Sequence, residues 1–133
     1  MPTIDDCDVN MGSITSLLSG APDTDYFKFT GNDVIGCAVD PTAQIDVAGV
    51  ELCVFVACKT AGSTITLNGC TGGTAAQGTP AGTVGCCTQT KTPVTVDYDC
   101  SGSDDSANVT LRAKRPAGSS DNTCTPYHVS YHF

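Results

Sequence analysis

Apolar and polar residues alternate with a period of two along most of the 133-residue chain, whereas no convincing helical stripe is present. The segment 50–58 differs, because it is apolar at nearly every position and therefore predicts a central strand covered on both faces. The segment 12–20 fits a short strand and, almost as well, a helical turn. The strand-forming segments are 12–20, 25–31, 33–40, 43–49, 50–58, 63–69, 93–100, 108–114 and 126–133.

The segments between these strands have the composition of turns. Thirteen aspartates against a single glutamate, with 14 Gly and 7 Pro, favour turns over helices. Residues 71–87 predict a long Gly/Thr/Ala loop, and residues 101–105 and 116–122 predict turns. Neither an internal repeat nor a linker interrupts the pattern. The sequence therefore predicts one all-β domain over 1–133, a β-sandwich or jelly-roll-like fold of about eight short antiparallel strands.

Cysteine is the most prominent feature of the composition. Its spread favours disulfides in an oxidising compartment, at the cell surface or outside the cell. Zinc is the rival interpretation, but Cys53-x4-Cys58 and Cys86-Cys87 lack the paired C-x2-C spacing of zinc ribbons. The chain has nine cysteines, and this odd number leaves at least one thiol without a partner in the same chain. Cys7, near a terminus, is predicted to be the unpaired or intermolecular cysteine. The other eight are disulfide candidates: Cys37, Cys53, Cys58, Cys70, Cys86, Cys87, Cys100 and Cys124.

One pairing follows from a geometric hypothesis. If 50–58 and 63–69 form a hairpin, Cys53 lies near Asn68, which makes Cys70 its nearer partner. The remaining connectivity cannot be derived from sequence.

The charge of the chain limits its partners. The formal net charge is −8 with a pI near 4.2, which argues against nucleic acid and against anionic membrane surfaces. No apolar run approaches the roughly 18–20 residues of a spanning helix, so we expect no membrane insertion. The residues MPTIDDCD have neither a basic start nor an apolar stretch, so a secreted chain would already have lost its leader.

Catalytic patterns are weak. The chain has neither a G-x-S-x-G elbow nor an H-E-x-x-H motif. His128 and His132 lie on a predicted strand, where residues four apart stand roughly 13 Å from each other and cannot share one ion. Asp23 and Asp25 stand one residue apart before an aromatic alternation. They fit a catalytic acid/base pair, a metal loop or the turn that begins a strand.

Calcium is the more serious site hypothesis. Asp6, Asp8 and Asn10 place oxygen side chains at alternate positions before Gly12, a pattern that can surround a hard cation. Met11 and Leu17 stand where an EF-hand needs Gly and an acid, so this is not an EF-hand. The simpler interpretation is an acidic turn in water, and Asp104-Asp105 and Asp121-Asn122 are predicted to be plain turn residues.

The stretch PDTDYFKFTG, 22–31, resembles the D-x-D-[WY]-[FY]-x-[FY]-[TS] signature of bacterial pre-peptidase C-terminal domains, which are small β-sandwich modules of secreted proteins. GSITSLLSG, DDSANVTLR and YHVSYHF match further segments of that family, and ELCVFVAC with GCC looks like a cysteine-rich version. The resemblance implies that Asp23 and Asp25 form the turn into a core strand. It also implies core positions for Phe27 and Phe29, and surface positions for Tyr26 and Lys28.

By this resemblance the chain is a non-catalytic extracellular binding or accessory module, not an enzyme. Its partner would be an extracellular protein or a polysaccharide, with Tyr26 the best candidate for stacking on sugar. Some members of the family bind calcium near the N-terminal segment, which implies the same for Asp6, Asp8 and Asn10. The alternative function is a structural subunit of a fibre or surface assembly, joined through strand edges or through Cys7 to neighbouring copies.

Overall fold

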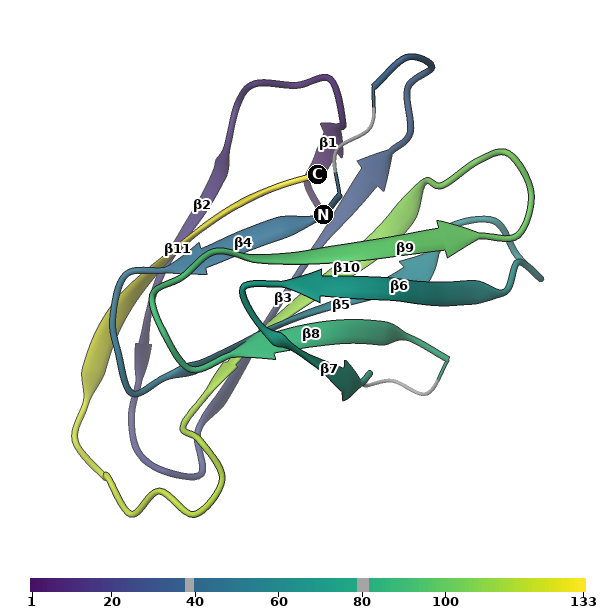
Figure 1. Ribbon diagram of the computed structural model, residues 1–133. Helices are drawn as coiled ribbons and strands as arrows, with labels where there is room; N and C mark the ends of the chain where they lie inside the picture. Colours follow the sequence, from purple (N-terminus) through teal and green to yellow (C-terminus); the bar gives the residue numbers. More distant parts are fainter. Residues whose placement is uncertain (38–39, 79–81) are drawn as a thin grey trace.

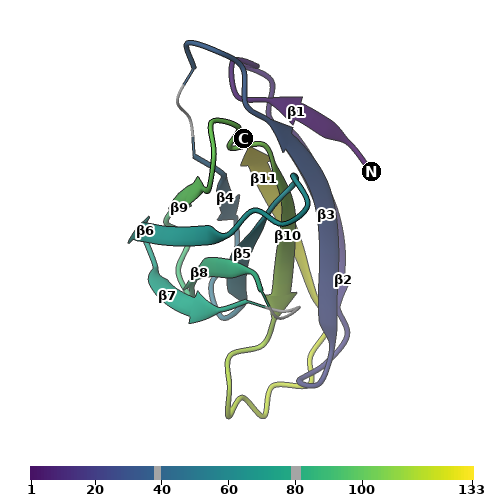
Figure 2. The same cartoon turned by 90° about the vertical axis from the view of Figure 1, so that its right-hand side faces the viewer.

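The computed structural model describes residues 1–37, 40–78 and 82–133, and these form two β-sheets packed face to face (Figures 1 and 2). In these ranges no helix is long and apolar enough to cross a membrane. The all-β sandwich predicted from the sequence is confirmed. The two sheets are called sheet A and sheet B below.

Consecutive strands lie in opposite sheets, with β7 and β8 as the one exception among the described strands. In spatial order, sheet A contains β1 (Thr3–Asp5), β3 (Thr24–Asn32), β10 (Ala107–Lys114), β5 (Glu51–Cys58), β8 (Val84–Thr88) and β7 (Thr74–Gln77). In the same way, sheet B contains β2 (Gly12–Leu18), β11 (Thr125–His132), β4 (Thr42–Ile45), β9 (Val94–Cys100) and β6 (Ile65–Thr71). The doubtful segment 12–20 is therefore a strand.

The core lies between the sheets and follows the alternation of the sequence. On β9, Val94, Val96 and Tyr98 are buried while Asp97 and Asp99 face solvent. The central strand β5 is buried on both faces, as its apolar run predicts. On its outer side, the ring of fully buried Phe55 lies 5.0 Å from the Arg112 guanidinium carbon, so an arginine covers part of the outward-facing apolar surface.

Three features of the strand prediction were wrong. The segment 33–40 forms no strand at its described positions, and 38–39 lie outside the described residues. The expected loop 71–87 contains β7 and β8. The short strand β1 was not predicted, and it pairs with β3 in parallel, so the sheets are not wholly antiparallel.

The glycines of 71–87 explain why this segment resembled a loop. A side chain at Gly85 would place its Cβ 2.3 Å from the Val54 carbonyl oxygen and 2.5 Å from the Phe55 ring. At Gly73 the Cβ would lie 2.5 Å from the Cys87 carbonyl oxygen. Gly85 allows close packing of the backbone within β8, and Gly73 does so in the connection between β6 and β7. Composition alone does not distinguish this role from flexibility.

Four disulfides connect the chain: Cys7–Cys37, Cys53–Cys87, Cys58–Cys100 and Cys70–Cys86. The prediction that Cys7 is unpaired was wrong, because β1 lies beside β3 and brings Cys7 to the loop that carries Cys37. Among the described residues, the free cysteine is Cys124, exposed in the connection between β10 and β11, so its prediction as a disulfide candidate was also wrong.

The suggested Cys53–Cys70 pair was also wrong, because β5 and β6 lie in different sheets and form no hairpin. Cys86 and Cys87 are neighbours on β8, and successive residues of a strand point to opposite faces. Cys87 therefore bonds Cys53, directly opposite on the neighbouring strand, while Cys86 crosses the sandwich to Cys70 on β6.

Candidate functional site: an acidic pocket at one end of the sandwich

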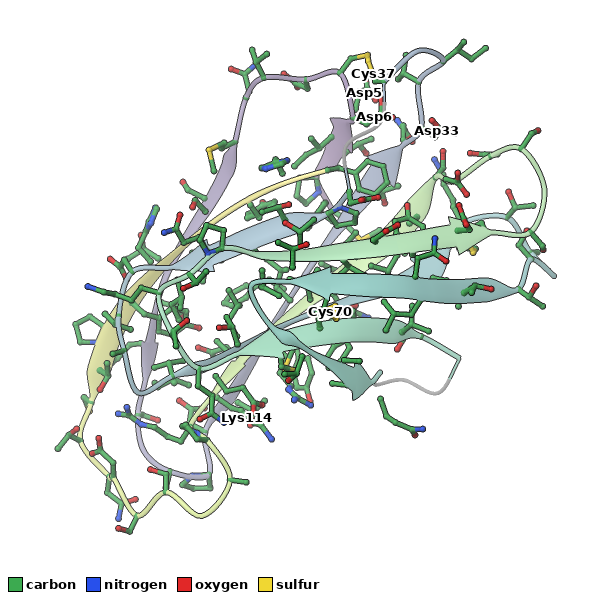
Figure 3. The ribbon with its side chains drawn as sticks, viewed as in Figure 1. Asp5, Asp6, Asp33, Cys37, Cys70 and Lys114 are labelled. Carbon is green, nitrogen blue, oxygen red and sulfur yellow. A yellow bond between two sulfur atoms is a disulfide. The ribbon has the colours of Figure 1, made fainter. Side chains whose placement is uncertain are left out.

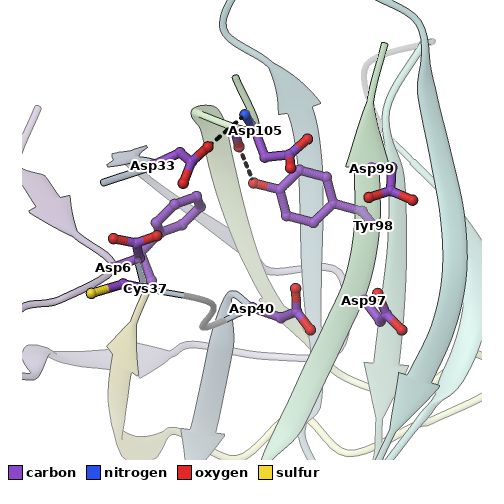
Figure 4. A pocket seen from close by; sticks show the side chains of 9 residues that line it. Asp6, Asp33, Cys37, Asp40, Asp97, Tyr98, Asp99 and Asp105 are labelled. Carbon is purple, nitrogen blue, oxygen red and sulfur yellow. Dashed lines mark hydrogen bonds between the residues drawn. The ribbon is translucent and has the colours of Figure 1, made fainter. Parts of the chain in front are cut away.

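A pocket of about 300 Å³ gathers six aspartates at the end of the sandwich near β1 (Figures 3 and 4). Its carboxylates come from the ends of β1 and β3, the start of β4, the middle of β9 and the turn before β10. We call this the acidic pocket. Its lining consists of Asp6, Asp33, Asp40, Asp97, Asp99 and Asp105, together with Cys37, Tyr98 and Phe133.

Backbone hydrogen bonds fix the carboxylates on the β1 and β3 side. Asp6 is buried, and its Oδ1 accepts a hydrogen bond from the Val34 backbone N–H at 3.1 Å. Asp33 Oδ2 accepts from the Asp105 backbone N–H at 3.2 Å, which connects the end of β3 to the turn before β10 (Figure 4). Each of these hydrogen bonds fixes the position of one carboxylate and uses only one of its two oxygens.

The turn before β10 is built by its own aspartates. Asp104 Oδ1 accepts from the Ser106 N–H at 2.9 Å, and Asp105 Oδ1 accepts from the Cys100 N–H at 2.8 Å. Asp104 thus acts as the predicted turn residue, whereas Asp105 also lines the acidic pocket and is more than a plain turn residue. The Tyr98 hydroxyl donates to the Asp105 carbonyl, and burial together with the nearby Asp105 charge raises the pKa of this phenol above its usual range.

Burial and the neighbouring negative charges both act on Asp40 in the pocket. Burial, followed by the charges of Asp97, Asp99 and Asp105, raises the pKa of Asp40 above its ordinary value. The Asn68 amide donates to Asp97 Oδ1 at 3.3 Å and to Asp99 Oδ2 at 2.9 Å, which partly offsets the repulsion between these two. In the described ranges, none of the six acids forms a salt bridge.

The chemistry of these oxygens suits a hard cation, but their spacing does not form a preassembled site. Two described groups bring three ligand atoms within 4.8 Å of one another, and both contain disulfide-bonded cysteines. Such sulfurs are not the thiolates that metals require. Calcium is bound by six to eight oxygens at about 2.3–2.6 Å. Binding in this pocket would need the carboxylates to move closer or water to complete the shell.

The fold places the predicted trio of Asp6, Asp8 and Asn10 in different surroundings, although Asp6 and Asp8 also line one shared hollow. Asp6 is buried against the acidic pocket, whereas Asp8 and Asn10 are exposed in the connection to β2. Asp8 Oδ1 accepts hydrogen bonds from both the backbone N–H and the side-chain amide of Asn10, at 3.0 and 2.8 Å. The calcium prediction stays a prediction. The structure adds five aspartates to the neighbourhood of Asp6 that the local motif did not indicate.

Asp23 and Asp25 have different roles. Asp23 forms the predicted turn, because its Oδ2 accepts from the backbone N–H and the hydroxyl of Ser19. Asp25 does not bond a neighbouring backbone N–H, since its Oδ2 accepts from the hydroxyls of Ser16 and Tyr127 on sheet B. It thereby connects the two sheets. His128 and His132 are half-buried on β11, as expected for histidines on a strand.

The pocket as a whole could not have been found from the sequence. Asp97 and Asp99 were visible as the polar face of a strand, and Asp105 as a turn residue. Asp33 and Asp40 bracket a segment that the pattern assigned to a strand. Only the crossing of the chain between sheets brings them together. Comparison of the chain with protein-family models, curated sequences and solved structures finds no match.

Proposed function

We propose that this protein is a non-catalytic extracellular module of a secreted or surface-attached protein. In that protein it binds a ligand or serves as an accessory module. The four disulfides carry the proposal, because such a density of bonds forms and persists in oxidising compartments. The resemblance of PDTDYFKFTG to bacterial pre-peptidase C-terminal domains supports the same role and a bacterial source.

The placement of the disulfides supports a rigid display scaffold. Cys58–Cys100 and Cys70–Cys86 each join sheet A to sheet B, and Cys7–Cys37 ties together two loops beside the acidic pocket. A scaffold held in this way keeps its loops and sheet faces in fixed positions, which favours binding by preformed surfaces.

Mass spectrometry of the unreduced native protein, after alkylation, tests the compartment. We expect eight oxidised cysteines and a single labelled thiol at Cys124, in a protein that elutes as a monomer. Nine alkylated cysteines in freshly isolated protein would contradict an extracellular module, because these bonds would then not form where the protein works.

Calcium as a stabilising ion is part of the proposal. It rests on the sequence pattern around Asp6 and is supported by the unneutralised charge of the pocket into which Asp6 points. Calorimetric titration of chelator-treated protein should give a binding heat that Asp6→Asn abolishes. Loss of this heat in Asp40→Asn but not in Asp8→Asn would assign the ion to the acidic pocket. Loss in Asp8→Asn but not in Asp40→Asn would assign it to the N-terminal turn. No heat in the wild type would remove calcium from the proposal.

A structural subunit of an assembly is the second candidate, favoured by the exposed thiol of Cys124. Size-exclusion chromatography with and without reductant separates the two. The leading proposal expects a monomer in both. A covalent dimer that disappears in Cys124→Ser would favour the assembly.

A further inference from the structure

The outward surface of sheet A has a charge opposite to that of the whole molecule. Cross-strand register places Tyr26 opposite Arg112, Lys28 opposite Thr110, and Thr24 opposite Lys114. The residues that alternate with them, such as Phe27 and Leu111, pack into the core, so these six residues share the outward face. Five of them, together with Asn108 on the same side of β10, form the surface that we call the basic face: Tyr26, Lys28, Thr110, Arg112, Lys114 and Asn108.

Three of the six basic residues of the chain lie on this face: Lys28, Arg112 and Lys114. One carboxylate opposes them, since Glu51 Oε1 lies 3.0 Å from Arg112 Nη2 and 3.6 Å from Lys114 Nζ. Three cations against one anion leave a local charge of +2 on a protein of net charge −8. Asp5 lies on the same sheet but beside Asn32, four residues or about 13 Å beyond Lys28 along β3.

Tyr26 and Lys28 are available to a ligand. The side chain of Tyr26 is half-exposed, and among the described residues its hydroxyl makes no hydrogen bond. Lys28 is exposed and, in the same ranges, forms no salt bridge. Arg112 is held in place beside them by Glu51 and by the ring of Phe55. The face therefore combines an exposed aromatic ring with one free and one fixed cation.

A hollow of about 300 Å³ continues the basic face beyond Tyr26. Lys28, Ala57, Asn108 and Thr110 line it, together with Met1. Asn108 is exposed, and its Oδ1 accepts a hydrogen bond from the Thr30 hydroxyl at 3.3 Å, which leaves its N–H groups as donors for a ligand. Lys28, Asn108 and Ala57 lie on the adjacent strands β3, β10 and β5 of one sheet, whereas Met1 and Thr83, which also line the hollow, lie outside the strands.

We propose that the basic face binds an anionic polysaccharide, one whose sugar units carry carboxylates. Sugar rings have apolar faces that pack on an aromatic ring, and their hydroxyls match the exposed amide of Asn108. Carboxylates match Lys28 and Arg112. From Asn108 to Lys114 the face extends for about 20 Å, which suits a linear polymer lying along β10. This inference rests on the proposed function and names its ligand class.

Charge favours a thin polymer over an acidic protein or a second copy of this chain. A bulky acidic partner would bring its charge close to the aspartate-rich remainder of a molecule with net charge −8. A second copy would carry the same −8. A thin polymer chain can instead follow the strip of Lys28, Arg112 and Lys114 alone, so it brings less of its charge near the other acids.

Calorimetric titration of the oxidised whole chain with polygalacturonate tests the proposal. Neutral dextran and poly-L-glutamate serve as comparison polymers. We expect polygalacturonate to bind, dextran to bind at least about tenfold more weakly, and affinity to fall as salt rises. Tyr26→Ala and Lys28→Ala should each weaken binding about tenfold, since one removes the stacking ring and the other the free cation.

Two matched variants control this experiment. Tyr26→Phe keeps the ring and should retain binding, and Lys91→Ala removes the same charge from a turn outside sheet A and should also retain it. Poly-L-glutamate binding as tightly as polygalacturonate would overturn the proposal in favour of an acidic polypeptide. Absence of polygalacturonate binding, or binding that Tyr26→Ala and Lys28→Ala leave unchanged, would also overturn it. If the polysaccharide proposal fails but the protein is an oxidised monomer, the proposed extracellular module still stands. Nine free thiols would instead contradict the proposed function.

Discussion

Individual aspartates of this chain respond to their surroundings in opposite ways. Hydrogen bonds from the Thr123 hydroxyl and backbone lower the pKa of Asp121 below the ordinary 3.8. In the acidic pocket, burial and then the neighbouring carboxylates raise the pKa of Asp40 above that value. Because folding lowers the pKa of Asp121, its ionised carboxylate stabilises the folded protein above pH 3.8. Because folding raises the pKa of Asp40, ionisation of Asp40 destabilises the folded protein.

Asp40→Asn should therefore raise the free energy of unfolding at pH 7, by less than about 1 kcal/mol because solvent screens a partly exposed charge. Because the pKa of Asp40 is raised in the folded protein, the protonated side chain contributes its full stability below pH 3.8. This contribution is lost as the pH rises through the raised pKa of the folded protein. The gain should accordingly vanish near pH 3. Urea unfolding at both pH values measures it. Asp121→Asn is the opposing control and should lower stability at pH 7. An equal gain in Asp40→Asn at both pH values would contradict the electrostatic cause.

The hydrogen bond from the Tyr127 hydroxyl to Asp25 connects the two sheets at the level of single residues. Tyr127→Phe should cost about 1–2 kcal/mol of unfolding free energy, because the partly buried carboxylate keeps only Ser16 as a side-chain partner. Tyr26→Phe removes a hydroxyl without a described partner and should be neutral. Equal effects of the two substitutions on urea unfolding would show that the bond to Asp25 contributes nothing.

Among the elements, β8 has the most constrained environment. It lies between β5 and β7, and its two cysteines bond in opposite directions, one along sheet A and one to sheet B. Gly85 lets its backbone approach β5 closely. The strand has five residues, and Val84 is its one aliphatic side chain. It therefore lacks the run of large apolar residues that identifies a core strand in a sequence.

Gly85→Ala should destabilise the oxidised protein by about 2–3 kcal/mol, because the new methyl would overlap the Val54 carbonyl and the Phe55 ring. Gly69→Ala on β6 is the matched control, since nothing lies within 4 Å of its Cβ position and its φ is not positive. This control should be neutral or slightly stabilising. Thermal unfolding followed by circular dichroism compares them. A neutral Gly85→Ala would mean that β8 does not pack against β5 as described.

For the whole molecule, Cys58–Cys100, which joins the two sheets and closes the longest loop of the four disulfides, should contribute most to stability. Cys58–Cys100 closes a sequence separation of 42 residues, against 16 for Cys70–Cys86. A bond that closes a longer loop removes more entropy from the unfolded chain. The core contains no tryptophan and few aromatic residues, so the covalent contribution is a large fraction of a typical domain stability.

Replacing Cys58 and Cys100 together by serine should lower the free energy of unfolding by about 3–4 kcal/mol. Cys124→Ser, which removes the thiol without a described disulfide, should leave it unchanged. Urea unfolding without reductant measures both. A double variant as stable as the wild type would show that the packed sheets alone determine stability.

The sequence by itself determined the sheet character of this protein, eight of its strands and the faces they bury. A period-two pattern is local, because each residue's side of the sheet depends only on its neighbours along the chain. The half-exposed ring of Tyr26 was predictable for the same reason, whereas the turn at Asp23 was implied by the family resemblance.

Only the tertiary structure decided which strands meet. Disulfide partners, the parallel pairing of β1, the acidic pocket and the basic face all depend on how the chain crosses between sheets, and strand pairing over long separations leaves no local mark in the residues. Lys28 and Arg112 are 84 positions apart, yet register between β3 and β10 places them on adjacent rungs of one face.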